Sequence, residues 1–149
     1  MGLKFSNHEI ILHALMKIEK AILTLQERTK VIKCADDFAL TPAGTEKLDA
    51  ACMLLIVIGE SIKNLDRITN RQLLPTYPSI KWKQVMGVRD IIAHHYFDVD
   101  IDVIYQIIHD DLTPLLEAIR FFIKEISEQG AQSVSYTHLR AHETLRYLV

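Results

Sequence analysis

Glycine, proline and cysteine are all scarce in this chain of 149 residues. Five glycines and four prolines leave room for few turns, so we expect few and long secondary-structure elements. Two cysteines, Cys34 and Cys52, are too few for a disulfide scaffold or a four-thiolate zinc site. The longest apolar run, Ala50 to Gly59, is about half of the ~20 residues that cross a bilayer. No secretory signal pattern opens the chain, so we expect a cytoplasmic protein that makes no membrane contact.

Positive charge is not in excess either. Lysine and arginine total 17 and aspartate and glutamate total 19, which gives a formal net charge of −2. This balance excludes a generally basic nucleic-acid binder but leaves room for a local basic patch. Because 49% of the residues are hydrophobic and 24% are charged, the composition is that of one globular domain and not of a disordered chain.

Apolar residues recur at helical spacing in four segments, of which the first two lie before Thr69. The first opens with a capping box that starts at Ser6, and it extends to about Lys33. The second has Thr41-Pro42 as its N-cap and first helical residue, and it ends near Leu65. Since Ala50 to Gly59 has no polar face, we expect this helix to be covered on all sides at the centre of a bundle.

The other two helical segments occupy the second half of the chain. One begins near Lys81 and ends near His94, and the last has Asp100 as its N-cap and continues to about Ile126. Pro114 lies inside this last stripe and should kink the helix, because it removes a backbone donor. No segment alternates convincingly with the period of a strand. The sequence therefore predicts an all-α, four-helix up-down bundle with a kinked last helix.

The end of the chain differs in character from the rest. Apolar periodicity stops after Gly130, so we assign residues 1–130 to one helical domain and treat 131–149 separately. The string from Ser135 to Thr144 resembles translated cloning-adaptor sequence. We expect this tail to be non-native or disordered and base no functional argument on it. The alternative is a genuine but weakly ordered C-terminal extension.

Residues suited to chemistry gather near the end of the third predicted helix. Arg89 is a permanent cation whose planar fork of donors suits a phosphate or a developing oxyanion. His94 can exchange a proton near neutral pH, and Asp90, four residues before it, could orient the imidazole. Arg89 and His94 are about 140° apart on an ideal helix, so they meet within one chain only if the helix ends or frays before His94. The alternative is a charged cluster that merely caps the helix C-terminus.

The same residues carry a recognisable motif. Arg89, His94 and Tyr96 form the pattern R-x4-H-x-Y. Flanking W-x4-G-x-R and F-x-V-D patterns add Trp82, Gly87, Phe97, Val99 and Asp100. With these patterns, about residues 5–127 resemble the HepT-like branch of the HEPN superfamily, whose members are small all-α ribonuclease toxins encoded beside a minimal nucleotidyltransferase antitoxin.

The resemblance implies a HEPN-like bundle that acts as a metal-independent endoribonuclease, the toxin of a type VII-like toxin–antitoxin pair. Arg89 would hold the scissile phosphate and stabilise the charge of the transition state. His94 would act as general acid or base, with the RNA 2′-hydroxyl as nucleophile and a cyclic phosphate as product. The cleft would lie between two protomers of a homodimer or a higher even oligomer, so that Arg89 of one chain could work beside His94 of the other. No cofactor and no DNA partner are implied.

The resemblance also implies regulation and supporting residues. Tyr96 matches the tyrosine that the nucleotidyltransferase partner modifies with AMP, and a bulky anion there would repel RNA phosphate. Asp90 occupies a position that is polar in this family, although a carboxylate adds negative charge beside a phosphate. Glu60 follows the apolar run and could support Arg89 from the neighbouring helix; it could equally be an ordinary surface residue at a helix end.

Three lysines are candidate contacts for RNA phosphates, namely Lys63, Lys81 and Lys83, with Arg67 and Arg71 nearby in the sequence. Solvated surface charge is the alternative for all of them. The histidines and aspartates between 94 and 109 lack the helix-borne E-x-x-H spacing, so we expect no metal site. The rival to a ribonuclease is a non-catalytic helical binding module, an accessory subunit of a nucleotidyltransferase.

Overall fold

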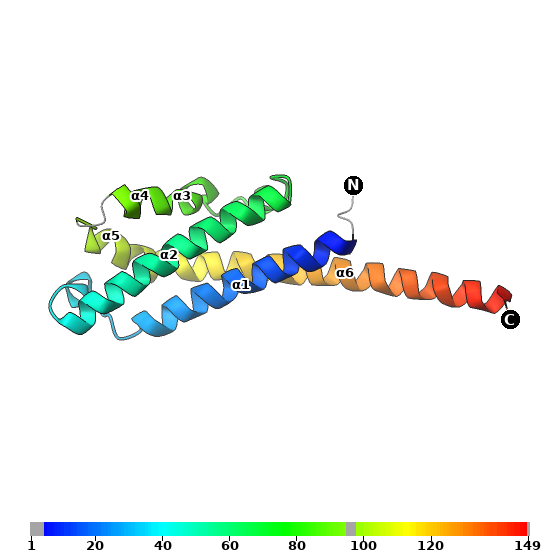
Figure 1. The fold of residues 1–149 in the computed structure, drawn as a ribbon, viewed down its shortest axis with the longest axis horizontal. Helices are drawn as coiled ribbons and strands as arrows, with labels where there is room; N and C mark the ends of the chain where they lie inside the picture. Colours follow the sequence, from blue (N-terminus) through cyan, green and yellow to red (C-terminus); the bar gives the residue numbers. More distant parts are fainter. Residues whose placement is uncertain (1–4, 95–97, 149) are drawn as a thin grey trace.

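Four antiparallel helical segments form the fold in this computed structural model, which describes residues 5–94 and 98–148 and the side chains of residues 7–93 and 98–130 (Figure 1). The helices are α1 (Phe5–Thr29), α2 (Pro42–Ile68), α3 (Trp82–Met86), α4 (Val88–His94), α5 (Ile101–Gln106) and α6 (Leu112–Leu148), with short turns η1 (Ala35–Phe38), η2 (Leu74–Thr76) and η3 (Ile107–Asp111). The described residues contain no strand, which confirms the all-α prediction.

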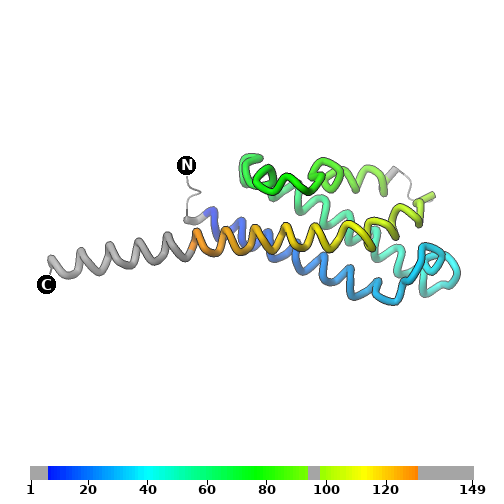
Figure 2. Tube along the Cα trace, turned by 180° about the vertical axis from the view of Figure 1, so that it is seen from behind, coloured from blue at the N-terminus to red at the C-terminus, as the bar shows by residue number. Residues whose placement is uncertain are grey.

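The order of the four segments is up-down. The first is α1 and the second is α2; α3 and α4 together make the third, which lies along α2 (Figure 1). The last consists of α5, η3 and α6, and it returns beside α1 (Figure 2). The sequence predicts a non-native or disordered tail over 131–149, and the side chains of this segment lie outside the described residues. None of the described helices combines the length and the apolarity needed to cross a membrane.

Aliphatic stripes of the long helices meet in the core. The fully buried members include Ile11, Leu15, Ile18, Ile22, Leu25, Ile58, Ile62, Leu65, Ile119 and Phe122. An aromatic cluster joins the third segment to the last: the Phe122 ring stacks on Trp82 at 5.8 Å between centroids and meets Tyr77 edge-on at 6.0 Å. The amphipathic periodicity of the sequence therefore corresponds to the faces that are buried.

Two of the predicted helix starts are confirmed by their caps. The Thr41 hydroxyl accepts a hydrogen bond from the Gly44 N–H at 2.9 Å, with Pro42 as the first residue of α2. The Asp100 carboxylate accepts from the Asp102 N–H at 2.9 Å and so caps α5. Both side chains satisfy amides that the first turn of a helix leaves without partners. The capping box predicted at Ser6 involves a side chain outside the described residues.

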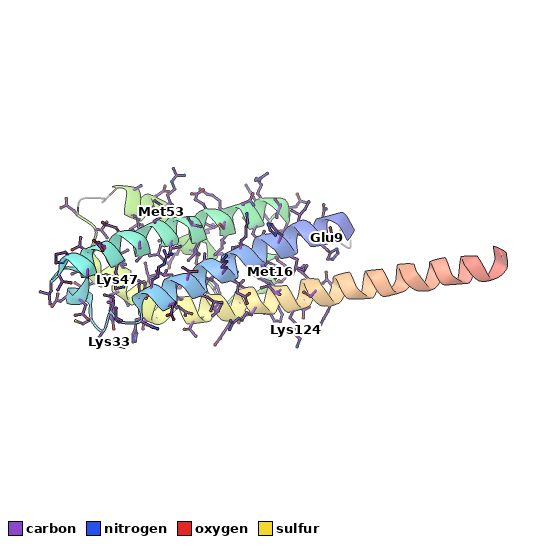
Figure 3. All side chains as sticks on the ribbon, turned by 60° about the horizontal axis from the view of Figure 1, so that its bottom comes forward. Glu9, Met16, Lys33, Lys47, Met53 and Lys124 are labelled. Atoms are coloured by element: carbon purple, nitrogen blue, oxygen red, sulfur yellow. The ribbon has the colours of Figure 1, made fainter. Side chains whose placement is uncertain are left out.

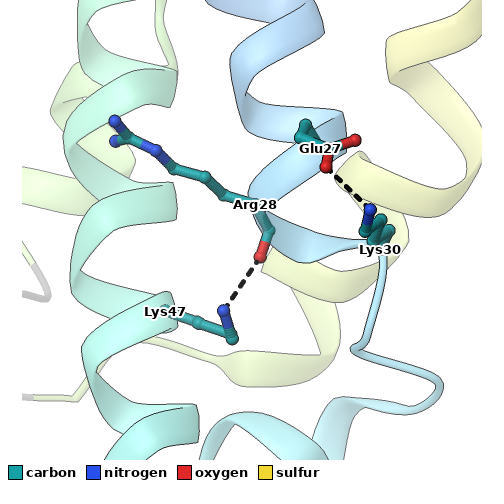
Figure 4. Close-up of polar contacts among 4 residues, drawn as sticks. All are labelled: Glu27, Arg28, Lys30 and Lys47. Atoms are coloured by element: carbon teal, nitrogen blue, oxygen red, sulfur yellow. Dashed lines mark hydrogen bonds and ion pairs between the residues drawn. The ribbon is translucent and has the colours of Figure 1, made fainter.

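The predicted end of the first helix is wrong by four residues. α1 ends at Thr29, because the chain then turns so that the Lys33 N–H donates to the Asp37 carboxylate at 2.7 Å. This hydrogen bond lowers the pKa of Asp37. Lys47 on α2 donates from its ammonium to the Arg28 carbonyl at 3.3 Å and joins the end of α1 to the start of α2 (Figure 4). The real boundary thus depends on contacts with residues beyond the helix.

The predicted irregularity at Pro114 takes the form of a π-helical turn. η3 (Ile107–Asp111) precedes Pro114, which lies in the first turn of α6. Pro114 has no N–H to donate to the carbonyl of Asp110, and a wider turn there leaves room for its ring. A single proline therefore divides the last helical segment into α5 and α6.

One expectation about α2 is wrong. The apolar run from Ala50 to Gly59 is not covered on all sides: Met53 (labelled in Figure 3) is 63% exposed, and Val57 is 42% exposed. The neighbouring helices α1, α3 and α4 pack against the remaining faces of α2 and leave this one open. Cys52, on a packed face, is buried, and burial raises the pKa of its thiol to about 11. A single chain therefore leaves part of its most apolar helix in contact with water.

Candidate active site

The third predicted helix is divided in two at the motif. α3 ends at Met86 and α4 begins at Val88, with Gly87 between them. The Gly87 N–H donates to the Lys83 carbonyl at 3.0 Å, which closes the end of α3. The Asp90 N–H in turn donates to the Gly87 carbonyl at 3.1 Å and starts α4. Because of this interruption, α4 has its own direction along α2. Arg89 lies in the first turn of α4.

A close approach at Gly59 fixes the position of α4 against α2. A Cβ atom added to Gly59 would lie 2.8 Å from the Val88 Cγ1 atom and 3.0 Å from the Val85 carbonyl oxygen. No side chain larger than hydrogen fits there without a shift of α3 or α4. Glu60 follows Gly59 on α2, and Arg89 follows Val88 on α4. The close approach of Gly59 and Val88 therefore brings the Glu60 and Arg89 side chains next to each other.

Arg89 and Glu60 form an ion pair across this crossing. The Arg89 Nη1 atom lies 3.4 Å from the Glu60 Oε1 atom, and the two side chains are 58% and 36% exposed. An exposed pair of this kind contributes about 0–1 kcal/mol to stability, because water and salt screen both charges. Glu60 therefore orients the guanidinium without neutralising it strongly, and a phosphate could replace the carboxylate as its partner.

The rest of the motif is only partly described. Asp90 is exposed on α4, and the backbone is helical through His94, so the helix does not end before His94 as a meeting with Arg89 within one chain would require. The His94 side chain lies outside the described residues, and so do His95, Tyr96 and Phe97. Among the residues that are described, no three His, Cys, Asp or Glu side chains are grouped in a way that could hold a metal ion.

A shallow, open pocket of about 640 Å³ continues from this ion pair along the outer face of α2. Glu60 belongs both to the ion pair and to the pocket, which is otherwise lined by Lys63, Asn64, Asp66, Arg67, Asn70 and Arg71. Lys81, at the start of α3, and Lys83, within it, are both exposed and do not line the pocket. From the sequence, Lys63, Arg67 and Arg71 were selected by their charge alone. The two asparagines were missed: Asn64, four residues after Glu60 on α2, could have been assigned to the same face, whereas Asn70 lies in the turn after the helix, where no periodicity indicates it.

Comparison with known proteins gives a consistent result. The family model described as Ribonuclease HepT-like matches residues 9–122. A Thermococcus cleftensis protein named "Probable ribonuclease HepT" is 33% identical over 98 residues, which cover 66% of this chain and 82% of that protein. A Methanocaldococcus jannaschii protein named "Gamma-glutamylcyclotransferase and putative RNase" is 32% identical over 113 residues, 74% of this chain and 46% of that protein.

A second Methanocaldococcus jannaschii protein, named "Putative RNase", is 31% identical over 80 residues, 54% of this chain and 63% of that protein. The chain thus spans less than two thirds of the length of both Methanocaldococcus relatives. No solved structure matches it. The family model, in contrast, covers most of the chain and all of the helices that position Arg89. The chain belongs to the HepT-like ribonuclease family.

Proposed function

We propose that the chain is a metal-independent endoribonuclease and the toxin of a toxin–antitoxin pair. The single observation that carries the proposal is the exposed Arg89 guanidinium, held beside α2 by Glu60 at 3.4 Å. A cation fixed in this way can bind the scissile phosphate and stabilise the additional negative charge of the transition state. The family and the names of its relatives as RNases support RNA as the substrate.

His94 supplies proton transfer in this proposal. It acts as general base on the 2′-hydroxyl or as general acid on the leaving 5′-oxygen, so that the products are a 2′,3′-cyclic phosphate and a free 5′-hydroxyl. Asp90, four residues earlier on α4, orients the imidazole from its own helix. Lys81 and Lys83, both exposed, contribute to the binding of RNA phosphates.

The active unit in this proposal is a homodimer in which Arg89 of one chain works beside His94 of the other. Two observations support it. The backbone of α4 is helical through His94, a geometry that separates the two residues within one chain. On the two helices that carry the ion pair, Met53 and Val57 of α2 and Ile91 of α4 are 63%, 42% and 52% exposed. A second copy packed against these helices would remove apolar side chains of this kind from water.

Mixing two inactive variants tests the enzyme and the dimer together. Arg89→Ala and His94→Ala are each expected to lose RNA cleavage in buffer with EDTA. When the two are unfolded together and refolded, half of the dimers contain one intact pair, and about a quarter of the wild-type activity should return. Detection of a 2′,3′-cyclic phosphate end identifies the reaction. If the wild type does not cleave RNA, the chain is instead a non-catalytic subunit of its partner; if mixing restores nothing, both groups act within one chain.

Control of the toxin is proposed to act through Tyr96, by transfer of AMP from a minimal nucleotidyltransferase partner. An AMP group two residues beyond His94 would place a bulky anion where the RNA phosphate binds. After co-expression with a minimal nucleotidyltransferase as partner, the intact mass of the chain should increase by whole AMP groups, and Tyr96→Phe should prevent the increase. A neutralised complex that contains unmodified Tyr96 would contradict this mechanism and indicate simple occlusion by the partner.

A further inference from the structure

The pocket on the outer face of α2 takes no part in the cleavage step proposed above. It combines three cations, Lys63, Arg67 and Arg71, with the side-chain amides of Asn64 and Asn70. We propose that this pocket is a second RNA subsite, which binds the backbone of single-stranded nucleotides on one side of the cleaved bond. The inference rests on the proposed function for the identity of the bound chain as RNA.

The charges of the pocket suit a phosphate backbone. Lys63 and Arg67 are four residues apart on α2, about 6 Å along its axis, and Arg71 lies in the turn that follows the helix, so the cations can contact more than one phosphate of an extended strand. All three cations are exposed, and within the described part of the chain none of them forms an ion pair. Two carboxylates line the pocket: Glu60 is already paired with Arg89, so the three cations exceed the one other carboxylate, Asp66. Positive charge that is not neutralised by the protein is therefore available to a polyanion.

The end of α2 has an unusual backbone at the same place. Asn70 and Arg71 both have positive φ angles, 54° and 61°. Helices that end in this way normally use glycine, and asparagine tolerates the left-handed region, but a long side chain such as that of Arg71 is strained in it. Strain of this kind persists where surrounding contacts hold the residue, here the hydrogen bond from the Arg71 N–H to the Asp66 carbonyl at 2.8 Å, and it is concentrated at ligand-binding sites. The turn places both side chains in the lining of the pocket.

The composition of the lining favours RNA over an acidic protein segment. The Asn64 and Asn70 amides can donate and accept hydrogen bonds, as recognition of base edges and 2′-hydroxyl groups requires. Arg67 already donates to the Asn64 side-chain oxygen at 2.6 Å, and this contact leaves the Asn64 amide group and the other guanidinium donors for a ligand. Since Glu60 joins the pocket to Arg89, a strand bound in the pocket leads directly to the proposed site of cleavage.

Equilibrium binding measures this subsite separately from catalysis. We would follow the fluorescence anisotropy of a labelled single-stranded RNA of about 12 nucleotides, with every protein carrying Arg89→Ala to prevent cleavage. Replacing Lys63, Arg67 and Arg71 together with alanine should weaken binding at least 10-fold. The slope of log K against log salt should fall by about 2, because each phosphate contact on a single strand contributes about 0.7.

Two further variants separate binding from general charge and from folding. The control replaces Lys17, Lys20 and Lys124, which are exposed on α1 and α6, and removes the same charge; it should change affinity less than about 2-fold. Arg71→Gly removes a cation and also relieves the left-handed strain. It should therefore weaken RNA binding while the melting temperature stays the same or rises, a combination that a purely structural role of Arg71 does not predict.

Equal losses of affinity in the pocket variant and the control would overturn the inference, since only net charge would then matter. Unchanged RNA binding together with lost binding of the nucleotidyltransferase would also overturn it and assign the pocket to the protein partner. If the wild type fails to cleave RNA but binds it through this pocket, the proposed function fails and the subsite stands. If the wild type cleaves RNA and the pocket variant binds RNA normally, the subsite is wrong and the proposed function stands.

Discussion

Arg89→Ala is expected to lower the rate of RNA cleavage by about 10³-fold, the order of magnitude lost when a group that stabilises developing phosphate charge is removed. The fold should be unaffected, because Arg89 is 58% exposed and its ion pair with Glu60 is long. We expect the free energy of unfolding to change by less than about 1 kcal/mol. Single-turnover cleavage of a labelled RNA and urea denaturation measure the two quantities.

Arg120 provides the matched control for Arg89. Its guanidinium nitrogen Nε lies 3.0 Å from a Glu19 carboxylate oxygen, and its side chain is 54% exposed. Arg120→Ala removes an arginine of the same kind from a similar surface ion pair between α1 and α6, and cleavage should be unchanged. Arg89→Lys should recover part of the activity, since lysine keeps the charge but not the planar fork of donors. Equal cleavage by Arg89→Ala and the wild type would remove Arg89 from the reaction.

Phe122→Ala should have the largest effect on stability. Phe122 has no exposed surface and packs its ring against both Trp82 and Tyr77, so its removal leaves a cavity between α6 and the third helical segment. Substitutions of this type cost about 3–5 kcal/mol, which for a chain of this size corresponds to a melting temperature lower by roughly 10 °C. Denaturant titration and a thermal melt followed by circular dichroism measure the loss.

The neighbouring phenylalanine is the control for this prediction. Phe121 also contacts Tyr77, at 5.3 Å between ring centroids, but 41% of it is exposed. Phe121→Ala should cost less than about 1.5 kcal/mol, because less apolar surface returns to water and water fills the space left behind. If both variants are destabilised equally, Phe122 is not the residue that secures α3 to α6.

Local patterns explain which parts of the fold were predictable from the sequence. The buried stripe of α1 follows from aliphatic residues at helical spacing, and the starts of α2 and α5 follow from Thr41 and Asp100, whose side chains cap the next few amides. In each case the physical cause lies within a few residues of its effect. The irregular turn before Pro114 is of the same kind, since a proline disturbs the helical turn that precedes it.

The errors have causes outside the segments from which the predictions were made. α1 ends at Thr29 and not near Lys33 because the Lys33 N–H donates a hydrogen bond to the carboxylate of Asp37, which lies beyond the helix. The apolar run of α2 predicted complete coverage, yet only packing decides which faces the neighbouring helices occupy, and Met53 is left exposed. Composition measures how much apolar surface must be buried; it does not specify whether the same chain or a second one covers it.

By itself, the sequence determined an all-helical bundle, the positions of most helix starts, and the R-x4-H-x-Y motif that placed the chain beside the HepT-like family. Only the tertiary structure decided that Glu60 meets Arg89 and that the basic residues on α2 and in the turn after it share a pocket which excludes Lys81 and Lys83. The reason is geometric. Contact between residues far apart in the chain depends on how two helices are rotated and how closely they approach, and here the missing side chain of Gly59 sets that distance against Val88.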